Sequence, residues 1–243
     1  MFDIINNALI AINKAGLSDF FYSVWLYIII VSIFIWSIWF SRKMGMKTLK
    51  AIILGVITYA SLYLCMVIYS WVENGFKFGG AMNNLYTFLF IPVFLLFFAK
   101  ILKIKWVDAC YIIAPFMPLQ QALAMCECTF GGCCRGYPSE IGLYSIRWDY
   151  YYFPIQQINS IYNFAVFIFL VLRAKKNNYK PDPYQYPLML ILMGVPRFFM
   201  EFLHDNEKVF LGCSSLAIYA LLMAIAGVVS IIILSKKKNK TIK

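Results

Sequence analysis

The sequence predicts an all-α membrane protein with seven transmembrane helices, an amino terminus outside the cell and a carboxyl terminus in the cytoplasm. Composition predicts the membrane: 62% of the 243 residues are hydrophobic and the mean hydropathy is +0.73. A soluble globule of this size cannot bury so much apolar side chain. The lengths of the apolar blocks predict the helices, and the uneven placement of Lys and Arg predicts their orientation.

Seven apolar blocks have about the length that a helix needs to cross roughly 30 Å of hydrocarbon. The third and sixth are short, so they can be tilted against neighbouring helices or only partly embedded. In chain order the blocks cover residues 20–40, 51–72, 85–99, 109–125, 155–172, 187–202 and 216–234. No linker long enough to separate two domains interrupts them, so we expect residues 1–243 to form one membrane domain.

Basic residues concentrate on one set of connecting segments. The turns after the first, third and fifth blocks, together with residues 235–243, hold 16 of the 22 Lys and Arg residues. Because basic loops stay in the cytoplasm, 235–243 is expected to be a basic cytoplasmic tail and 1–19 an outer-face amphipathic segment. Segment 1–19 lacks the basic start and apolar run of a cleavable signal peptide. The net charge of +11 favours contact with anionic lipid headgroups, and no nucleic-acid partner is expected.

Charged residues inside the sixth block indicate a site. Arg197 and Glu201 are four residues apart and His204 follows three later, so on a helix all three project from one face. Pro196 is expected to free a backbone carbonyl and bend the segment. Ionisable groups at membrane depth are costly and usually serve a substrate path. The alternative is an ion pair that only fastens this helix to a neighbour.

Amides form a polar stripe on the fifth block. Gln156, Asn159 and Asn163 recur at intervals of three and four residues, which places them on one helix face. Substrate contact and hydrogen bonding between helices explain such a stripe equally well. Earlier in the chain, the pair Gly79 and Gly80 permits positive φ and close backbone approach.

The stretch MCECTFGGCCRGYP, residues 125–138, places four cysteines and three glycines between two apolar regions. Its Cys-x-Cys and adjacent Cys-Cys spacings fit a zinc site poorly, so no metal is expected. A disulfide remains open outside the membrane, although seven cysteines leave at least one thiol unpaired. Arg135 and the backbone N–H groups near Gly136 suit an anion such as phosphate.

These motifs together resemble the prolipoprotein diacylglyceryl transferase family, and the resemblance runs in order over residues 21–205. CTFGGCCRG is similar to a Firmicute version of the family signature, and MGVPRFFMEFLHD to the pattern in its sixth span. The resemblance implies substrate-binding roles for residues that match the family pattern. In chain order these are Tyr22, Gly79, Gly80, Cys128, Gly136 and Gln156, while Asp108 and Ala114-Pro115 match at the fourth span.

The chain also departs from the family pattern. Phe78 stands where the family has a turn histidine, and Met125 where its signature has arginine. Phe153 replaces a second histidine, Asn159 a glutamate and His204 the last arginine. The departures have two explanations. Either Arg135 and His204 supply part of the headgroup binding and catalysis that the replaced residues serve in the family, or the chain is a paralogue with another substrate.

The resemblance implies a bacterial cell-membrane enzyme with its active site toward the outer face and no cofactor. It moves the diacylglyceryl group of a phosphatidylglycerol-like phospholipid to the lipobox cysteine of a secreted preprolipoprotein. Arg197, with Arg135, is expected to clamp the phosphate, and Glu201 to orient Arg197, while His204 is the candidate base. Two alternatives remain open: a paralogue with another lipid donor or acceptor, and a non-catalytic lipid-binding membrane protein.

Overall fold

The structure is a computed structural model that describes residues 2–73, 75, 87–205 and 212–242. Helices dominate the described chain, as the sequence predicts. In chain order the elements are α1 (Phe2–Lys14), α2 (Ser18–Lys43), α3 (Thr48–Glu73), α4 (Thr87–Leu102), α5 (Trp106–Ile113), α6 (Phe116–Gly131), β1 (Pro138–Tyr144), β2 (Tyr151–Tyr152), α7 (Ile155–Lys176), α8 (Gln185–Met200), the 3-10 turn η1 (Glu201–Leu203) and α9 (Ser215–Ile242).

Six segments of the described chain are long and apolar enough to cross a membrane. They cover Ser18–Lys43, Thr48–Trp71, Trp106–Gly131, Ile155–Lys176, Gln185–Leu203 and Ser215–Asn239. The block predicted at 85–99 appears as α4, an apolar helix of 16 residues that is about 24 Å long. The fourth block consists of α5 and α6, which meet at Ala114 and Pro115.

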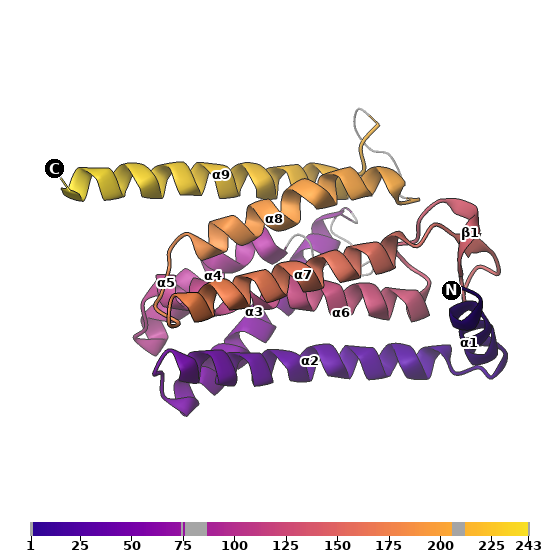
Figure 1. Ribbon diagram of the computed structural model, residues 1–243. Helices are drawn as coiled ribbons and strands as arrows, with labels where there is room; N and C mark the ends of the chain where they lie inside the picture. The colour runs from indigo at the N-terminus through magenta and orange to yellow at the C-terminus, as the bar shows by residue number, and fades with distance from the viewer. Residues whose placement is uncertain (1, 74, 76–86, 206–211, 243) are drawn as a thin grey trace.

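The long helices form an elongated bundle with α6 inside it (Figure 1). In the α5–α6 segment 83% of the most apolar stretch is buried, far more than in any other spanning segment of the described chain. Helix α6 packs against α2 and α7, while α8 packs along α9. Near its end α6 carries Cys126, Glu127 and Cys128, and these polar side chains are half-buried among the neighbouring helices.

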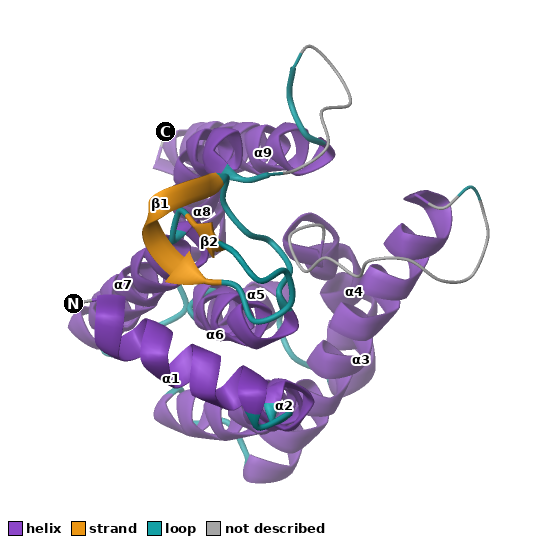
Figure 2. Ribbon diagram, turned by 90° about the vertical axis from the view of Figure 1, so that its right-hand side faces the viewer, coloured by secondary structure: helices purple, strands orange, loops and turns teal. Residues whose placement is uncertain are grey.

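A small β-hairpin at one end of the bundle was not predicted from the sequence. Strands β1 and β2 are antiparallel, and α1 lies beside them across the end of α2 (Figure 2). Asn6 of α1 binds both sides of a short stretch of β1: its Nδ2 donates to the Gly142 carbonyl at 3.1 Å and its Oδ1 accepts from the Tyr144 N–H at 2.8 Å. The predicted amphipathic segment is therefore a helix that anchors the hairpin.

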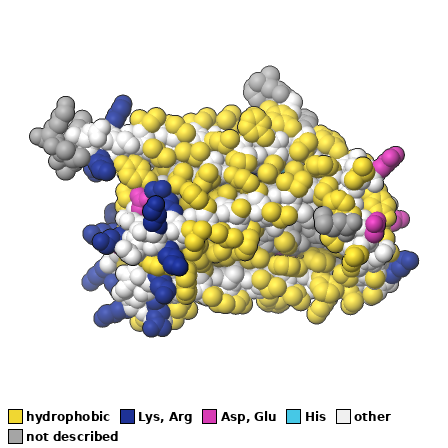
Figure 3. Space-filling view, in the orientation of Figure 1, with side chains coloured by type: hydrophobic (Ala, Val, Ile, Leu, Met, Phe, Trp, Pro, Cys, Tyr) yellow, Lys and Arg dark blue, Asp and Glu magenta, His cyan; other side chains and the backbone are white. Residues whose placement is uncertain are grey.

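Charge is separated along the bundle. Figure 3 shows Lys and Arg side chains gathered at the end formed by the α2–α3 and α7–α8 turns. A hydrophobic belt covers the middle, and acidic side chains appear at the opposite end. The predicted tail continues α9 as helix up to Ile242.

Two prolines inside helices leave backbone carbonyls that other helices satisfy. A proline lacks the N–H that binds the carbonyl four residues earlier. For Pro196 of α8 that carbonyl belongs to Leu192, and the Tyr162 hydroxyl of α7 donates to it at 2.8 Å. The prediction that Pro196 frees a carbonyl is therefore confirmed.

Candidate functional site

The charged residues predicted on the sixth block lie together at the end of α8. The helix ends at Met200, so His204 follows a 3-10 turn in extended conformation, and the prediction that all three residues share one helix face is wrong for His204. Arg197 and Glu201 form an ion pair, with side chains 5% and 1% exposed. Nη1 of Arg197 lies 3.1 Å from Nε2 of His204.

The His204 imidazole is neutral in this arrangement. A guanidinium only donates hydrogen bonds, so Nε2 of His204 must accept from Arg197. Burial, and then the positive charge of Arg197, lower the pKa of His204 to about 4. The basic nitrogen of the chain's single histidine is thus already occupied.

Glu201 also connects α8 to the start of α9. Its Oε2 accepts a hydrogen bond from the Ser214 hydroxyl at 2.9 Å. The same hydroxyl accepts from the Ala217 N–H at 3.1 Å, which satisfies one of the free donors at the beginning of α9. The buried ion pair therefore has a structural role whether or not it contacts substrate.

The segment with Arg135 and Gly136 runs directly beside this cluster. Gly136 pairs with His204 through the backbone, and the Asp205 N–H donates to the Arg135 carbonyl at 3.0 Å. The Arg135 guanidinium lies 3.2 Å from the Asp205 carboxylate and stacks over the Trp148 ring, 4.6 Å from its centroid. Asp205 and Trp148 therefore hold the Arg135 guanidinium at the edge of the cluster.

Three thiols meet where α6 ends. The sulfur atoms of Cys128, Cys133 and Cys134 all lie within 4.8 Å of one another. Gly132 ends α6 with φ +65°, and Cys134 has φ +53°. These two left-handed residues bring the Cys133-Cys134 pair back to Cys128, and the surroundings must hold Cys134 in a conformation that non-glycine residues rarely adopt.

Charge and hydrogen bonding distinguish the thiols. The thiols of Cys128 and Cys133 hydrogen bond to Cys134 and hold its pKa well below the usual range, with a further contribution from Arg197. Contact with Cys128 lowers the pKa of Cys133, but the contacts with Cys134 and the surrounding protein outweigh it and raise this pKa to about 12. Arg197 and His204 thus lie close enough to Cys134 to link the charged cluster with the thiols.

Gln156 at the start of α7 fixes the backbone around the thiols. Its Nε2 donates to the carbonyls of Cys128, at 3.4 Å, and Cys133. Its Oε1 accepts from the Tyr152 hydroxyl at 2.8 Å. Because Gln156 is 1% exposed and used on both sides, it positions this segment and does not reach into the cavity. Asn163 similarly binds Asn159, with 2.5 Å between Nδ2 and Oδ1.

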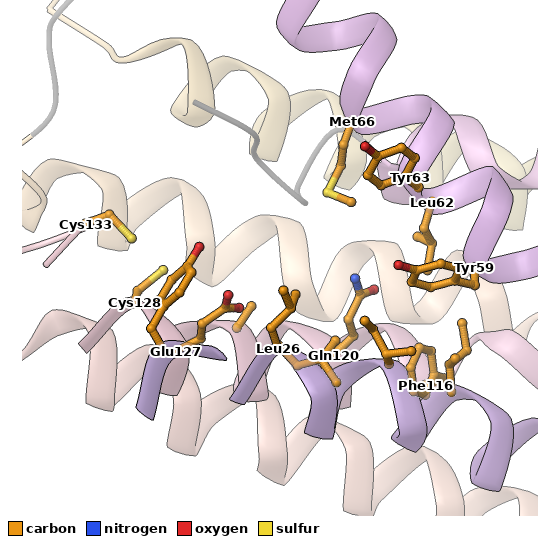
Figure 4. Close-up of a pocket in the computed structure, with 15 residues that line it drawn as sticks. Leu26, Tyr59, Leu62, Tyr63, Met66, Phe116, Gln120, Glu127, Cys128 and Cys133 are labelled. Carbon is orange, nitrogen blue, oxygen red and sulfur yellow. The ribbon is translucent and has the colours of Figure 1, made fainter. Parts of the chain in front are cut away.

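A mostly apolar cavity of about 350 Å³ opens beside the thiols, between α2, α3 and α6. Figure 4 shows the sulfur atoms of Cys128 and Cys133 directed toward each other at one end. Tyr22 of α2 and Glu127 of α6 also line this end and interact with each other. Small-molecule sites commonly combine such an apolar wall with a few convergent polar groups.

The structure thus unites most of the residues predicted for the site. Tyr22 and Cys128 line the cavity, Gln156 supports the thiols, and the charged residues adjoin Cys134. Gly79 and Gly80, together with Phe78, lie outside the described residues. Sequence reasoning missed Glu127 and the convergence of Cys133 with Cys134. An acidic residue two positions beyond the apolar block at 109–125 was the available signal for Glu127.

Comparisons with known proteins agree on one family. A family model described as prolipoprotein diacylglyceryl transferase matches residues 20–233. A curated relative from Clostridium perfringens (strain 13 / Type A), named phosphatidylglycerol–prolipoprotein diacylglyceryl transferase 2, is 26% identical over 157 residues. That match covers 57% of this chain and 57% of the relative, so the chain spans little more than half of the relative's length.

Proposed function

The chain belongs to the prolipoprotein diacylglyceryl transferase family, and on that premise we propose that it transfers a diacylglyceryl group to a cysteine thiol. The donor is a phosphatidylglycerol-like lipid and the acceptor is the lipobox cysteine of a secreted preprolipoprotein. One observation carries the proposal: an apolar cavity, a thiol cluster and a buried arginine are adjacent in one site. The cavity suits acyl chains, and the arginine suits a phosphate leaving group.

The proposal assigns roles to the charged residues and to the polar side chains that line the cavity. Arg197, with Arg135 at the edge, stabilises the negative charge that develops on the phosphate. Glu201 and His204 orient Arg197 through their contacts with its guanidinium. Tyr22 binds the lipid headgroup, and Glu127 accepts the proton of the acceptor thiol, since both line the cavity.

The membrane arrangement is part of the same proposal. Helix α4 crosses the membrane in addition to the six longer segments, which gives seven crossings, and residues 1–243 form one membrane domain. The basic end of the bundle faces the cytoplasm, because basic loops are retained there (Figure 3). The thiol cluster, which lies toward the other end, then faces the outer side. A secreted acceptor reaches the site only in this orientation.

A second candidate is a transferase that uses another lipid donor. Met125 stands at the position of the family's signature arginine and is only 4% exposed, within α6. That position therefore offers an apolar side chain where the family pattern has a cation, which favours a different headgroup.

Label transfer tests the proposal. The protein, in native-lipid particles, is given phosphatidylglycerol labelled in its glyceryl backbone and a lipobox peptide, and the peptide is analysed by mass spectrometry. We expect label on the peptide cysteine, a loss in Arg197→Ala, and retention in Arg173→Ala, whose arginine pairs with Asp182 at the opposite end. Transfer at the wild-type rate in Arg197→Ala contradicts the assigned role. Absence of transfer with a different co-purified lipid favours the second candidate.

A further inference from the structure

We propose that Cys128, Cys133 and Cys134 bind a zinc ion whose fourth coordination position is open to the acceptor thiol. Binding of the metal stands on the geometry of the three cysteines. The role of the fourth position rests on the proposed function. Three protein ligands with one open position are typical of catalytic zinc, whereas structural zinc is closed by four.

The sulfur positions fit such an ion. Zinc–sulfur bonds of about 2.3 Å in a tetrahedron place the ligand sulfurs about 3.8 Å apart. The three sulfurs lie within 4.8 Å of one another, so closing on the metal requires only a small movement. Thiolate ligands select soft or borderline ions, and zinc, which has no redox chemistry, suits a transfer in which nothing is oxidised.

The surrounding structure holds the ligands in place. Gln156 donates to the carbonyls of Cys128 and Cys133, and the Trp148 indole donates to the Gly132 carbonyl at 2.9 Å. Such supporting contacts fix the orientation of metal ligands. Three thiolates leave the zinc centre with one net negative charge, and the Arg197 guanidinium, which lies near Cys134 and is also paired with Glu201, lowers the cost of that charge.

The open position faces the cavity. Cys128 and Cys133 line the cavity (Figure 4), and Cys133 is exposed. Cys134 is not part of the cavity lining and lies near Arg197. An acceptor thiol that enters from the cavity thus reaches the free side of the metal. The only histidine of the chain is occupied by Arg197, so no free imidazole activates this thiol.

The metal supplies that activation, because a coordinated thiol is deprotonated. The thiol proton passes to the Glu127 carboxylate, and the sulfur binds zinc as a thiolate. This sulfur then forms a bond to the glyceryl carbon of the donor, while the carbon–oxygen bond to phosphate breaks. The electron pair stays on the phosphate oxygen, glycerol phosphate leaves, and zinc keeps its oxidation state.

Metal content is the first measurement. The protein is purified in native-lipid particles with reductant and without chelator, and its metals are measured by elemental mass spectrometry. We expect about one zinc ion per chain. Cys133→Ser, which alters an exposed side chain, is expected to lower the zinc content at least about tenfold. Cys126→Ser is the matched control and retains zinc, because Cys126 instead contacts the Ser160 hydroxyl at 3.3 Å.

Cobalt(II) substitution then reports the fourth ligand. A thiolate-to-cobalt absorption band is expected, and it should intensify on addition of a lipobox peptide but not of the same peptide with serine in place of cysteine. Zinc no higher than in Cys133→Ser, or a disulfide among the three cysteines in anaerobically alkylated protein, overturns the site. Full label transfer by zinc-free protein overturns its role while the proposed function stands. Zinc bound without any label transfer leaves the site intact and removes the proposed function.

Discussion

Replacing Glu201 with glutamine leaves the Arg197 guanidinium without its buried partner. The two side chains are 5% and 1% exposed, so water cannot hydrate the remaining charge in place. Removing one member of a buried ion pair costs about 3–5 kcal/mol. We therefore expect Glu201→Gln to lower the free energy of unfolding by about this amount, a large share of the roughly 5–15 kcal/mol of a typical domain.

Thermal unfolding in native-lipid particles, followed by tryptophan fluorescence, measures the effect. The double variant Arg197→Met/Glu201→Leu removes both charges and is expected to recover most of the stability but none of the label transfer. This separates the fastening role of the pair from its role toward phosphate. In the control Asp182→Asn, which breaks a pair whose arginine is 40% exposed, the loss is at most about 1 kcal/mol. Unfolding of Glu201→Gln at the wild-type temperature refutes the reasoning, because Arg197 then has access to water.

Three further substitutions test other parts of the structure. A Cβ at Gly194 would lie 2.6 Å from the Ala220 carbonyl oxygen of α9, so Gly194→Ala should lower the free energy of unfolding by about 1–3 kcal/mol. The control Gly55→Ala, whose Cβ would have no contact under 3.3 Å, should not lower it. Equal melting temperatures for the two variants contradict the close packing of α8 on α9. Tyr162→Phe leaves the carbonyl freed by Pro196 without a donor and should cost about 1 kcal/mol by the same assay, and no loss means that another group satisfies it. Glu127→Gln should lower the rate of label transfer about 100-fold or more with little change in KM, and a rate within twofold of wild type excludes Glu127 as the proton acceptor.

Composition and spacing predicted the features that depend on local sequence. Apolar blocks indicated the spanning helices because a helix that crosses the hydrocarbon core needs a continuous run of apolar side chains. The four-residue separation of Arg197 and Glu201 indicated their ion pair because residues four apart are neighbours on a helix, and this spacing holds to the end of α8. His204 still contacts Arg197, but through a 3-10 turn that the spacing did not indicate.

Features that depend on the path of the backbone were not predictable. The thiols converge only because Gly132 and Cys134 adopt positive φ, and spacing alone gives no sign of a left-handed cysteine. The hairpin was missed because β2 is two residues long, too short for an alternating pattern. Gln156 was recognised as part of a polar stripe, but its partners, the carbonyls of Cys128 and Cys133, lie on another helix and its following turn.

The proline carbonyls bear on how the protein is assembled in the bilayer. The carbonyl of Phe88, freed by Pro92 of α4, accepts from the Tyr186 hydroxyl of α8 at 2.6 Å, just as α8 receives Tyr162 from α7. Inserted alone, α4 and α8 each carry a carbonyl that hydrocarbon cannot satisfy. Both carbonyls are paired when α8 lies between α4 and α7, so packing of α8 against these two helices removes both unpaired groups and holds the segment that bears Arg197.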